Sequence, residues 1–266
     1  MLSPRTRMAT AMAFRDQLRR PLVLILLIAV PVFIVILSVA KTQPMPRRFE
    51  LPGGAWVTTT DKALHGPEMA KITVAFVAAL VGVFVMQSAL TGDRRLVAAG
   101  YRLGETILSR LSVLAAATVV VVAVSALALR VGFTPVAWPL VIVALLLTGL
   151  IYGAIGALAG ALLDRLAATY LMLFLAMSDF GVVQTPMFHA RPARFSWLFP
   201  GYAPTGVMLE GSYSTSFHTV SDLVLALAWT ATLTIGVYFV LRRRLGVKER
   251  VPAVVPSGGI ERGWSR

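Results

Sequence analysis

The chain has 266 residues, of which 57% are hydrophobic and 14% charged, and its formal net charge at pH 7 is +13. A soluble domain carries about 25% charged residues, so this composition excludes a soluble enzyme and indicates a membrane protein. The chain has no cysteine, which excludes disulfide bonds, thiol nucleophiles and cysteine-ligated metal sites. Arginines that orient the chain in the bilayer, rather than nucleic-acid binding, are the first explanation of the positive charge.

The first element is the basic segment 1–20. It has Ala11, Phe14 and Leu18 on one helical face and Arg15 and Arg19 on another. This pattern predicts a helix lying on the inner membrane surface. A solvated basic arm that only sets the orientation of the chain is an equal alternative.

Six uncharged runs that follow approach or exceed the length of about 20 residues that a bilayer-spanning helix needs. The runs are 21–40, 72–92, 111–129, 136–163, 166–190 (interrupted by Asp179) and 223–241. The first run is longer than the apolar part of a signal peptide and is expected to stay uncleaved. The sequence therefore predicts an all-α polytopic membrane protein, with a six-span domain over residues 21–245 and a disordered basic tail over residues 246–266.

The basic residues predict the orientation of these spans. An even number of spans places both termini on one side, and that side holds 17 of the 25 Lys and Arg residues. Positive residues concentrate on the cytoplasmic side of inner (plasma) membranes. Both termini are therefore expected in the cytoplasm. The segments 41–70 and 190–218 are then external; the first shows little periodicity, and the second is apolar but divided by prolines and glycines.

The longest cytoplasmic connection, residues 91–110, is the main candidate for an interaction surface. Gly100 and Gly104 indicate a short helix between turns. The connection is either a solvated turn or a docking surface for a cytoplasmic partner. Its candidate contact residues are Asp93, Arg94, Arg95, Tyr101, Arg102 and Glu105.

Asp179 is the one acidic residue inside a predicted span. A carboxylate at membrane depth indicates function by default, which makes Asp179 a candidate for a transport pathway. Gly181 and Pro186 follow closely, so Asp179 is also a candidate for lining a helix break near the outer interface. Both interpretations stay open.

The fourth span carries glycines at a spacing that lets helix backbones approach closely. They are Gly149, Gly153, Gly156 and Gly160. This spacing predicts tight helix packing, either within the bundle or across a dimer.

Motifs for catalysis and for phosphate binding are absent from the sequence. None of the four lysines follows a glycine, so the chain has no Walker A motif and cannot hydrolyse ATP by that route. It also lacks G-x-S-x-G and H-E-x-x-H. The three histidines lie in predicted external segments without a second ligand at helical spacing. No catalytic, cofactor-binding or metal-binding residue is expected in this chain.

Three stretches resemble the membrane subunit of an ATP-binding-cassette (ABC) exporter of the six-helix type-2 class. RMATAMAFRDQLRRP is similar to the family's interfacial connecting helix. DRRLVAAGYRLGETILSRL resembles the inner loop that carries its coupling helix. TPMFHARPARFSWLFPGYAPTGVMLEG, followed by a last span and RRRLG, resembles its re-entrant external hairpin, final helix and basic end.

The resemblance implies a permease subunit that exports a hydrophobic or lipid-like substrate or a drug. It implies a homodimer or a pair with a paralogous permease, within membrane lipid, and a separate cytoplasmic subunit that binds ATP and Mg. The loop from Asp93 to Glu105 is then the ATPase-coupling loop. The alternative is a stand-alone secondary transporter or channel-like protein, which usually carries midplane charges. An intramembrane enzyme is disfavoured because the acid and base groups it needs are missing.

Overall fold

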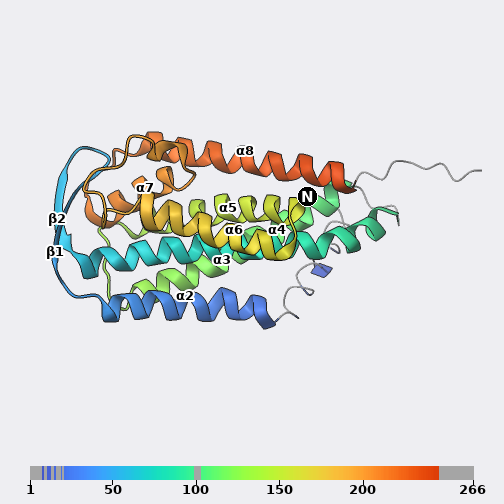
Figure 1. Cartoon of the computed structure of the whole chain (residues 1–266), viewed down its shortest axis with the longest axis horizontal. Helices are drawn as coiled ribbons and strands as arrows, with labels where there is room; N and C mark the ends of the chain where they lie inside the picture. The colour runs from blue at the N-terminus through green and yellow to red at the C-terminus, as the bar shows by residue number, and fades with distance from the viewer. Residues whose placement is uncertain are drawn as a thin grey trace, which may run out of the picture.

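The computed structural model describes residues 21–98 and 103–245, together with Met8, Ala11, Met12, Arg15 and Arg19. The predicted interfacial helix over residues 1–20 and the predicted tail over residues 246–266 lie largely or wholly outside the described residues. The described part is mostly helical, and its long helices lie side by side in one bundle (Figure 1). They are α2 (Pro21–Lys41), α3 (Asp61–Ala98), α4 (Leu103–Leu129), α5 (Trp138–Leu162), α6 (Arg165–Ser178) and α8 (Val220–Leu245).

Within the described residues, five helical segments are long and apolar enough to cross a membrane, so the chain is a multi-pass membrane protein. These segments are Asp61–Ser88, Gly104–Leu129, Trp138–Leu162, Arg165–Val183 and Val220–Arg244. In α2 the apolar stretch Ile25–Lys41 is shorter. The spanning part of α3 is 83% buried inside the bundle, whereas that of α8 is 11% buried. Helix α3 therefore forms the centre of the bundle, and α8 lies at its surface.

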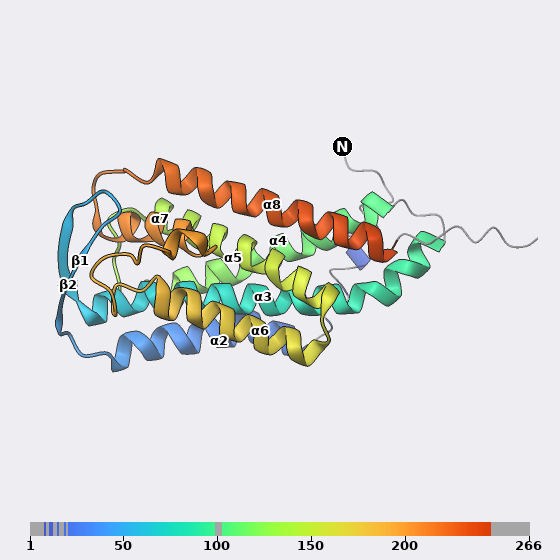
Figure 2. The same cartoon turned by 45° about the horizontal axis from the view of Figure 1, so that its top comes forward.

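One end of the bundle carries a β-hairpin that the sequence analysis did not predict. Strands β1 (Pro46–Glu50) and β2 (Trp56–Thr60) pair antiparallel, within the segment expected to be an irregular loop. The turn between them contains Gly54 at φ +79°, a left-handed conformation that glycine adopts without strain. The fold is thus helical with one added hairpin. We call this end of the molecule the β-hairpin end, and the opposite end, where α2 begins and α8 stops, the terminal end (Figures 1 and 2).

Polar contacts attach the β-hairpin to the bundle. Arg47 Nε donates to the Oδ1 atom of Asp61, the first residue of α3, at 2.8 Å. This hydrogen bond raises the pKa of Arg47 above its usual value. The guanidinium group of Arg191, in the segment between α6 and α8, lies 5.3 Å from the ring centroid of Trp56, whereas the 4.9 Å contact of Arg48 with the same ring lies within the hairpin. These contacts hold the hairpin over the ends of the helices.

The predicted glycine motif of α5 packs against helices of the same chain. A Cβ atom on Gly156 would lie 2.7 Å from the Cα atom of Ala79, and one on Gly160 would lie 2.7 Å from the Cα atom of Val83, both on α3. Side chains of α4 cover Gly149 and Gly153. Helices α3 and α5 therefore touch backbone to backbone, which only small residues permit.

The connection 91–110 differs from the expected short helix between turns. Helix α3 continues without a break to Ala98, and α4 begins at Leu103. Asp93, Arg94 and Arg95 therefore lie on the last turns of α3, beyond its apolar segment. Glu105 lies in the first turn of α4. Tyr101 and Arg102 fall outside the described residues.

The segment between α6 and α8 folds back into the β-hairpin end. Helix α6 passes into a π-helical turn, η1 (Asp179–Val183), and the chain then forms a 3-10 turn, η2 (Ser196–Leu198), and α7 (Tyr202–Tyr213). The prolines and glycines of this segment divide it, as expected, so that no single long helix forms. Helix α7 is nearly all buried and packs against α5 and α8. This packing brings α7 next to the charged residues of α3.

Candidate functional site

A buried ion pair lies on the first turns of α3, near the β-hairpin end. The Nζ atom of Lys71 is 2.8 Å from the Oε1 atom of Glu68, and the two side chains are 0% and 1% exposed. The residues are three positions apart, so their side chains share one face of the helix. Two charges removed from water cost several kcal/mol each unless they are paired and hydrogen-bonded.

Lys71 also reaches two other elements. Its Nζ atom lies 3.3 Å from the Oγ1 atom of Thr205 on α7, which accepts a hydrogen bond. The same nitrogen lies 5.7 Å from the ring centroid of Phe180 in η1, a distance suited to a cation–π contact. Lys71 therefore connects α3 to the segment between α6 and α8.

Asp179 lies where α6 becomes the π-helical turn. Its Oδ2 atom accepts hydrogen bonds from the Tyr152 hydroxyl at 2.5 Å and from the Gly201 backbone N–H at 2.8 Å. A Cβ atom on Gly201 would lie 2.6 Å from that oxygen, so only glycine fits there. Through these hydrogen bonds, Asp179 links the break between α6 and η1 to α5 and to the start of α7. The side chain is fully buried and also interacts electrostatically with Lys71.

We call Glu68, Lys71 and Asp179 the charge cluster. Asp179, one of the site residues expected from the sequence, lies at the junction of α6 and η1, and Lys71 acts on it electrostatically. Lys71 was taken as the boundary of the second span, but α3 begins ten residues earlier, at Asp61. The signal that was missed is the spacing of Glu68 and Lys71, because opposite charges three residues apart neutralise each other on a helix.

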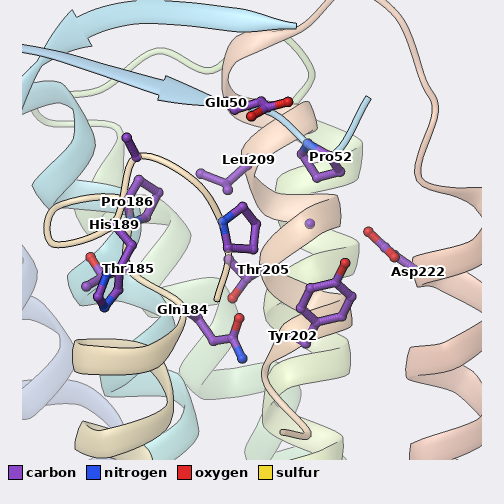
Figure 3. Close-up of a pocket in the computed structure, with 13 residues that line it drawn as sticks. Glu50, Pro52, Gln184, Thr185, Pro186, His189, Tyr202, Thr205, Leu209 and Asp222 are labelled. Carbon is purple, nitrogen blue, oxygen red and sulfur yellow. The ribbon is translucent and has the colours of Figure 1, made fainter. Parts of the chain in front are cut away.

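A small cavity, which we call the polar cavity after the polar side chains among its lining, lies between the loop that follows η1, α7, α8 and the end of β1 (Figure 3). Its volume is about 40 Å³, enough for a few water molecules. It is lined by the loop that follows η1, by α7 and by α8, and its polar residues include Gln184, Thr185, Tyr202, Thr205 and Asp222. Thr205 also accepts a hydrogen bond from Lys71. A single hydrogen bond therefore links a residue that lines this cavity to the charge cluster.

A larger cavity lies between α3 and the segment from α6 to Phe188. We call it the lateral cavity. Its volume is about 460 Å³, and its lining is mostly apolar. Glu68 and His65 are the two titratable residues that line it, and Thr185 lines both cavities. The two cavities are therefore neighbours that share Thr185, and of the charge cluster only Glu68 lines the lateral cavity.

Another buried carboxylate of the β-hairpin end, Glu210, has structural contacts. Glu210 on α7 accepts hydrogen bonds from the backbone N–H groups of His218 and Thr219, at 2.8 and 3.1 Å, and from the Thr219 hydroxyl at 2.9 Å. It thereby caps the start of α8. In the part of the chain that the structure describes, no three His, Asp or Glu side chains form a group suited to a metal ion.

The structure does not bring the predicted site residues together. Asp93, Arg94 and Arg95 lie near the end of α3 opposite to Glu68 and Asp179. Helix α3 has 38 residues, which corresponds to a length of about 57 Å. The residues of the connection 91–110 and the charge cluster are therefore two separate sites, one near each end of α3.

The hydrogen bonds of Asp179 lead to a prediction that separates its two candidate roles. Asp179→Ala is expected to lower stability by about 1–3 kcal/mol, because Tyr152 and Gly201 lose a buried acceptor. Asp179→Asn keeps an acceptor oxygen and is expected to lose about 1 kcal/mol or less. Thermal unfolding in detergent measures both changes. A transport defect in Asp179→Asn at full stability supports the pathway role, whereas unchanged transport supports the helix-break role.

No protein-family model matches the chain, and no curated protein is significantly similar to it. The function is therefore argued from the charge cluster, the two cavities and the path of α3.

Proposed function

We propose that the chain is the membrane-spanning permease subunit of an ABC exporter, which moves a hydrophobic or lipid-like substrate or a drug outward. The observation that carries this proposal is the continuity of α3. One unbroken helix holds the charge cluster near one end and Asp93, Arg94 and Arg95 near the other. A movement imposed at the terminal end would therefore be transmitted directly to the two cavities.

The proposed topology has six spans, with α2 as the first and α8 as the last. Helix α2 begins and α8 stops at the terminal end, which supports the placement of both termini on one side (Figures 1 and 2). The excess of basic residues assigns that side to the cytoplasm of the plasma (inner) membrane. The β-hairpin and α7 then face outward. In this topology the segment from η1 to α7 is the re-entrant external hairpin.

In the proposed mechanism, two permeases pair and each binds an ATPase subunit that holds ATP and Mg. Closure of the two ATPases moves the inner end of α3. Coupling requires that the ATPase contacts differ between the inward and outward states. Helix α3 touches α5 backbone to backbone, whereas it packs on the α6–η1 segment through side chains and leaves the lateral cavity near the β-hairpin end. Relative motion is therefore expected between α3 and α6, where the packing leaves space.

Copurification tests this proposal. The tagged chain, expressed with its native neighbouring genes and solubilised gently, is expected to retain an ATPase subunit with a Walker A motif. Failure to retain any ATPase under conditions that keep the chain folded would contradict the proposal. The same preparation in vesicles is expected to transport only when ATP is supplied on the side of the ATPase.

Charge reversal of Arg94, Arg95 and Arg102 is expected to lower ATPase retention at least about tenfold, or to uncouple hydrolysis from transport, because interface charges hold and orient a partner. The matched control reverses Arg242, Arg243 and Arg244, three charges on the last turn of α8. That control is expected to retain the ATPase. Equal transport in both triple variants would show that the connection 91–110 does not couple the ATPase to transport.

A second candidate function is a stand-alone secondary transporter, and the charge cluster is the observation that favours it. Ionisable residues buried in spans mark ion pathways in such proteins. This candidate predicts transport by the chain alone, driven by an ion gradient and abolished by an ionophore. The exporter proposal predicts that an ionophore has no effect while ATP is present.

A further inference from the structure

Apolar side chains that are exposed on the surface of the bundle border the lateral cavity. Phe174, Met177, Val182 and Phe188 line it, and these large apolar side chains are exposed. On a spanning segment, such an exposed apolar surface contacts lipid rather than water. A ligand dissolved in the bilayer could therefore enter the cavity without crossing an aqueous phase.

Glu68 is the one carboxylate among the residues that line the lateral cavity. Glu68 lines the cavity while its side chain is 1% exposed. Its Oε1 atom lies 2.8 Å from the Lys71 Nζ atom, and Thr185 approaches the carboxylate from the loop that follows η1. His65, one turn earlier on α3, contacts the sulfur of Met187 at 3.2 Å. Glu68 is therefore paired with Lys71 on one side and borders a mostly apolar cavity on the other.

With both carboxylates ionised, the charge cluster carries one negative charge in excess. Two carboxylates, Glu68 and Asp179, share the ammonium group of Lys71. In the part of the chain that the structure describes, Lys71 is the only basic group acting on both of them. Because buried charges are stable only when they are compensated, the cluster favours one further positive charge.

We infer that the lateral cavity binds a lipophilic cation, with its apolar body between α3 and α6 and its positive group at the Glu68 carboxylate. This inference deepens the proposed function, on which it rests, by naming the substrate class and the place of entry from the bilayer. An anion of the same shape would meet the carboxylate and be rejected. The site selects by charge at one end and by apolar volume at the other.

Two ions of nearly the same shape and opposite charge test the inference. Tetraphenylphosphonium and tetraphenylborate are titrated into the purified full chain in lipid nanodiscs, and binding is measured by equilibrium dialysis. The cation is expected to bind saturably and at least about tenfold more tightly than the anion, which corresponds to about 1.4 kcal/mol. Equal binding of the two ions would overturn the inference.

The variant Glu68→Gln removes the charge with little change of shape and is expected to weaken binding of the cation at least about tenfold. Its matched control is Asp222→Asn, the same change at a carboxylate that lines the polar cavity instead. The control is expected to leave binding unchanged. Loss of binding in Asp222→Asn but not in Glu68→Gln would place the site in the polar cavity and overturn the inference.

A second variant tests the cavity if Glu68→Gln does not fold. A Cβ atom on Gly181 would lie 3.7 Å from the side chains of Ile72 and Met177, an ordinary contact. Gly181→Phe would therefore fill the lateral cavity without disturbing the charges, and it is expected to abolish binding of the cation. Retained binding in this variant would overturn the inference.

The binding experiment is independent of the ATPase. If the chain binds the cation but never retains an ATPase, the proposed function fails while the site stands. If an ATPase is retained and the cation does not bind, the site fails while the proposed function stands.

Discussion

Lys71→Met is expected to lower the stability of the folded chain by about 3–5 kcal/mol, which is the largest effect of any single substitution considered for the charge cluster. The ammonium group lies 2.8 Å from Glu68 and interacts with Asp179, and all three side chains are buried. Its removal leaves two buried carboxylates without a cation, and breaking one half of a buried pair has a cost of this size. Denaturation in detergent, followed by circular dichroism, measures the change.

The double variant Glu68→Gln/Lys71→Met tests whether the loss of stability comes from a buried carboxylate left without a cation. Because it removes both members of the pair, it is expected to recover at least half of the lost stability. The matched control is Arg47→Met, which breaks the partly exposed ion pair with Asp61 and is expected to change stability by about 1 kcal/mol or less. A Lys71→Met variant as stable as Arg47→Met would show that the ion pair is not buried as described.

Gly156→Ala is expected to destabilise the bundle by about 1–3 kcal/mol, or to prevent folding, although it adds a single methyl group. The new Cβ atom would lie 2.7 Å from the Cα atom of Ala79 and closer still to its carbonyl oxygen. Backbone atoms of α3 cannot rotate away as a side chain can, so α3 and α5 would have to separate. Overpacking of this kind costs stability even when the added volume is small.

The matched control for this substitution is Gly236→Ala on α8. There the Cβ atom would lie 3.8 Å from the Leu158 side chain, an ordinary contact. Alanine also favours a helix more than glycine does, so this variant is expected to be as stable as the parent or slightly more stable. The yield of monodisperse protein and the thermal unfolding midpoint measure both variants. Equal midpoints for the two variants would contradict the close approach of α3 and α5.

The two interfaces of α3 have different physical properties. On the side of α5, glycines bring the backbones together, and a shift of either helix would cause overlap of atoms. On the side of α6 and η1, α3 borders the lateral cavity, and Lys71 reaches Thr205 on α7 through a single hydrogen bond of 3.3 Å. We therefore expect α3 and α5 to move together as one rigid pair in any conformational change.

The amino-acid sequence by itself determined that this is a multi-pass helical membrane protein. The bilayer requires runs of about 20 apolar residues, and such runs are a property of local composition. The predicted spans around α4, α5 and α8 consequently agree with the helices of the structure. The division of the segment between α6 and α8 also followed from local residues, because proline and glycine interrupt helices wherever they stand.

Only the tertiary structure decided which charged residues are buried and what they contact. In the sequence, Lys71 marked the end of an uncharged run, because a count of charges does not show which charges are paired. Its pairing with Glu68 and its contact with Thr205 depend on the path of α3 and the position of α7. The same holds for Asp179, whose partners Tyr152 and Gly201 are 27 and 22 residues away along the chain. Hydropathy is local, whereas compensation of a buried charge is a property of neighbours that folding brings together.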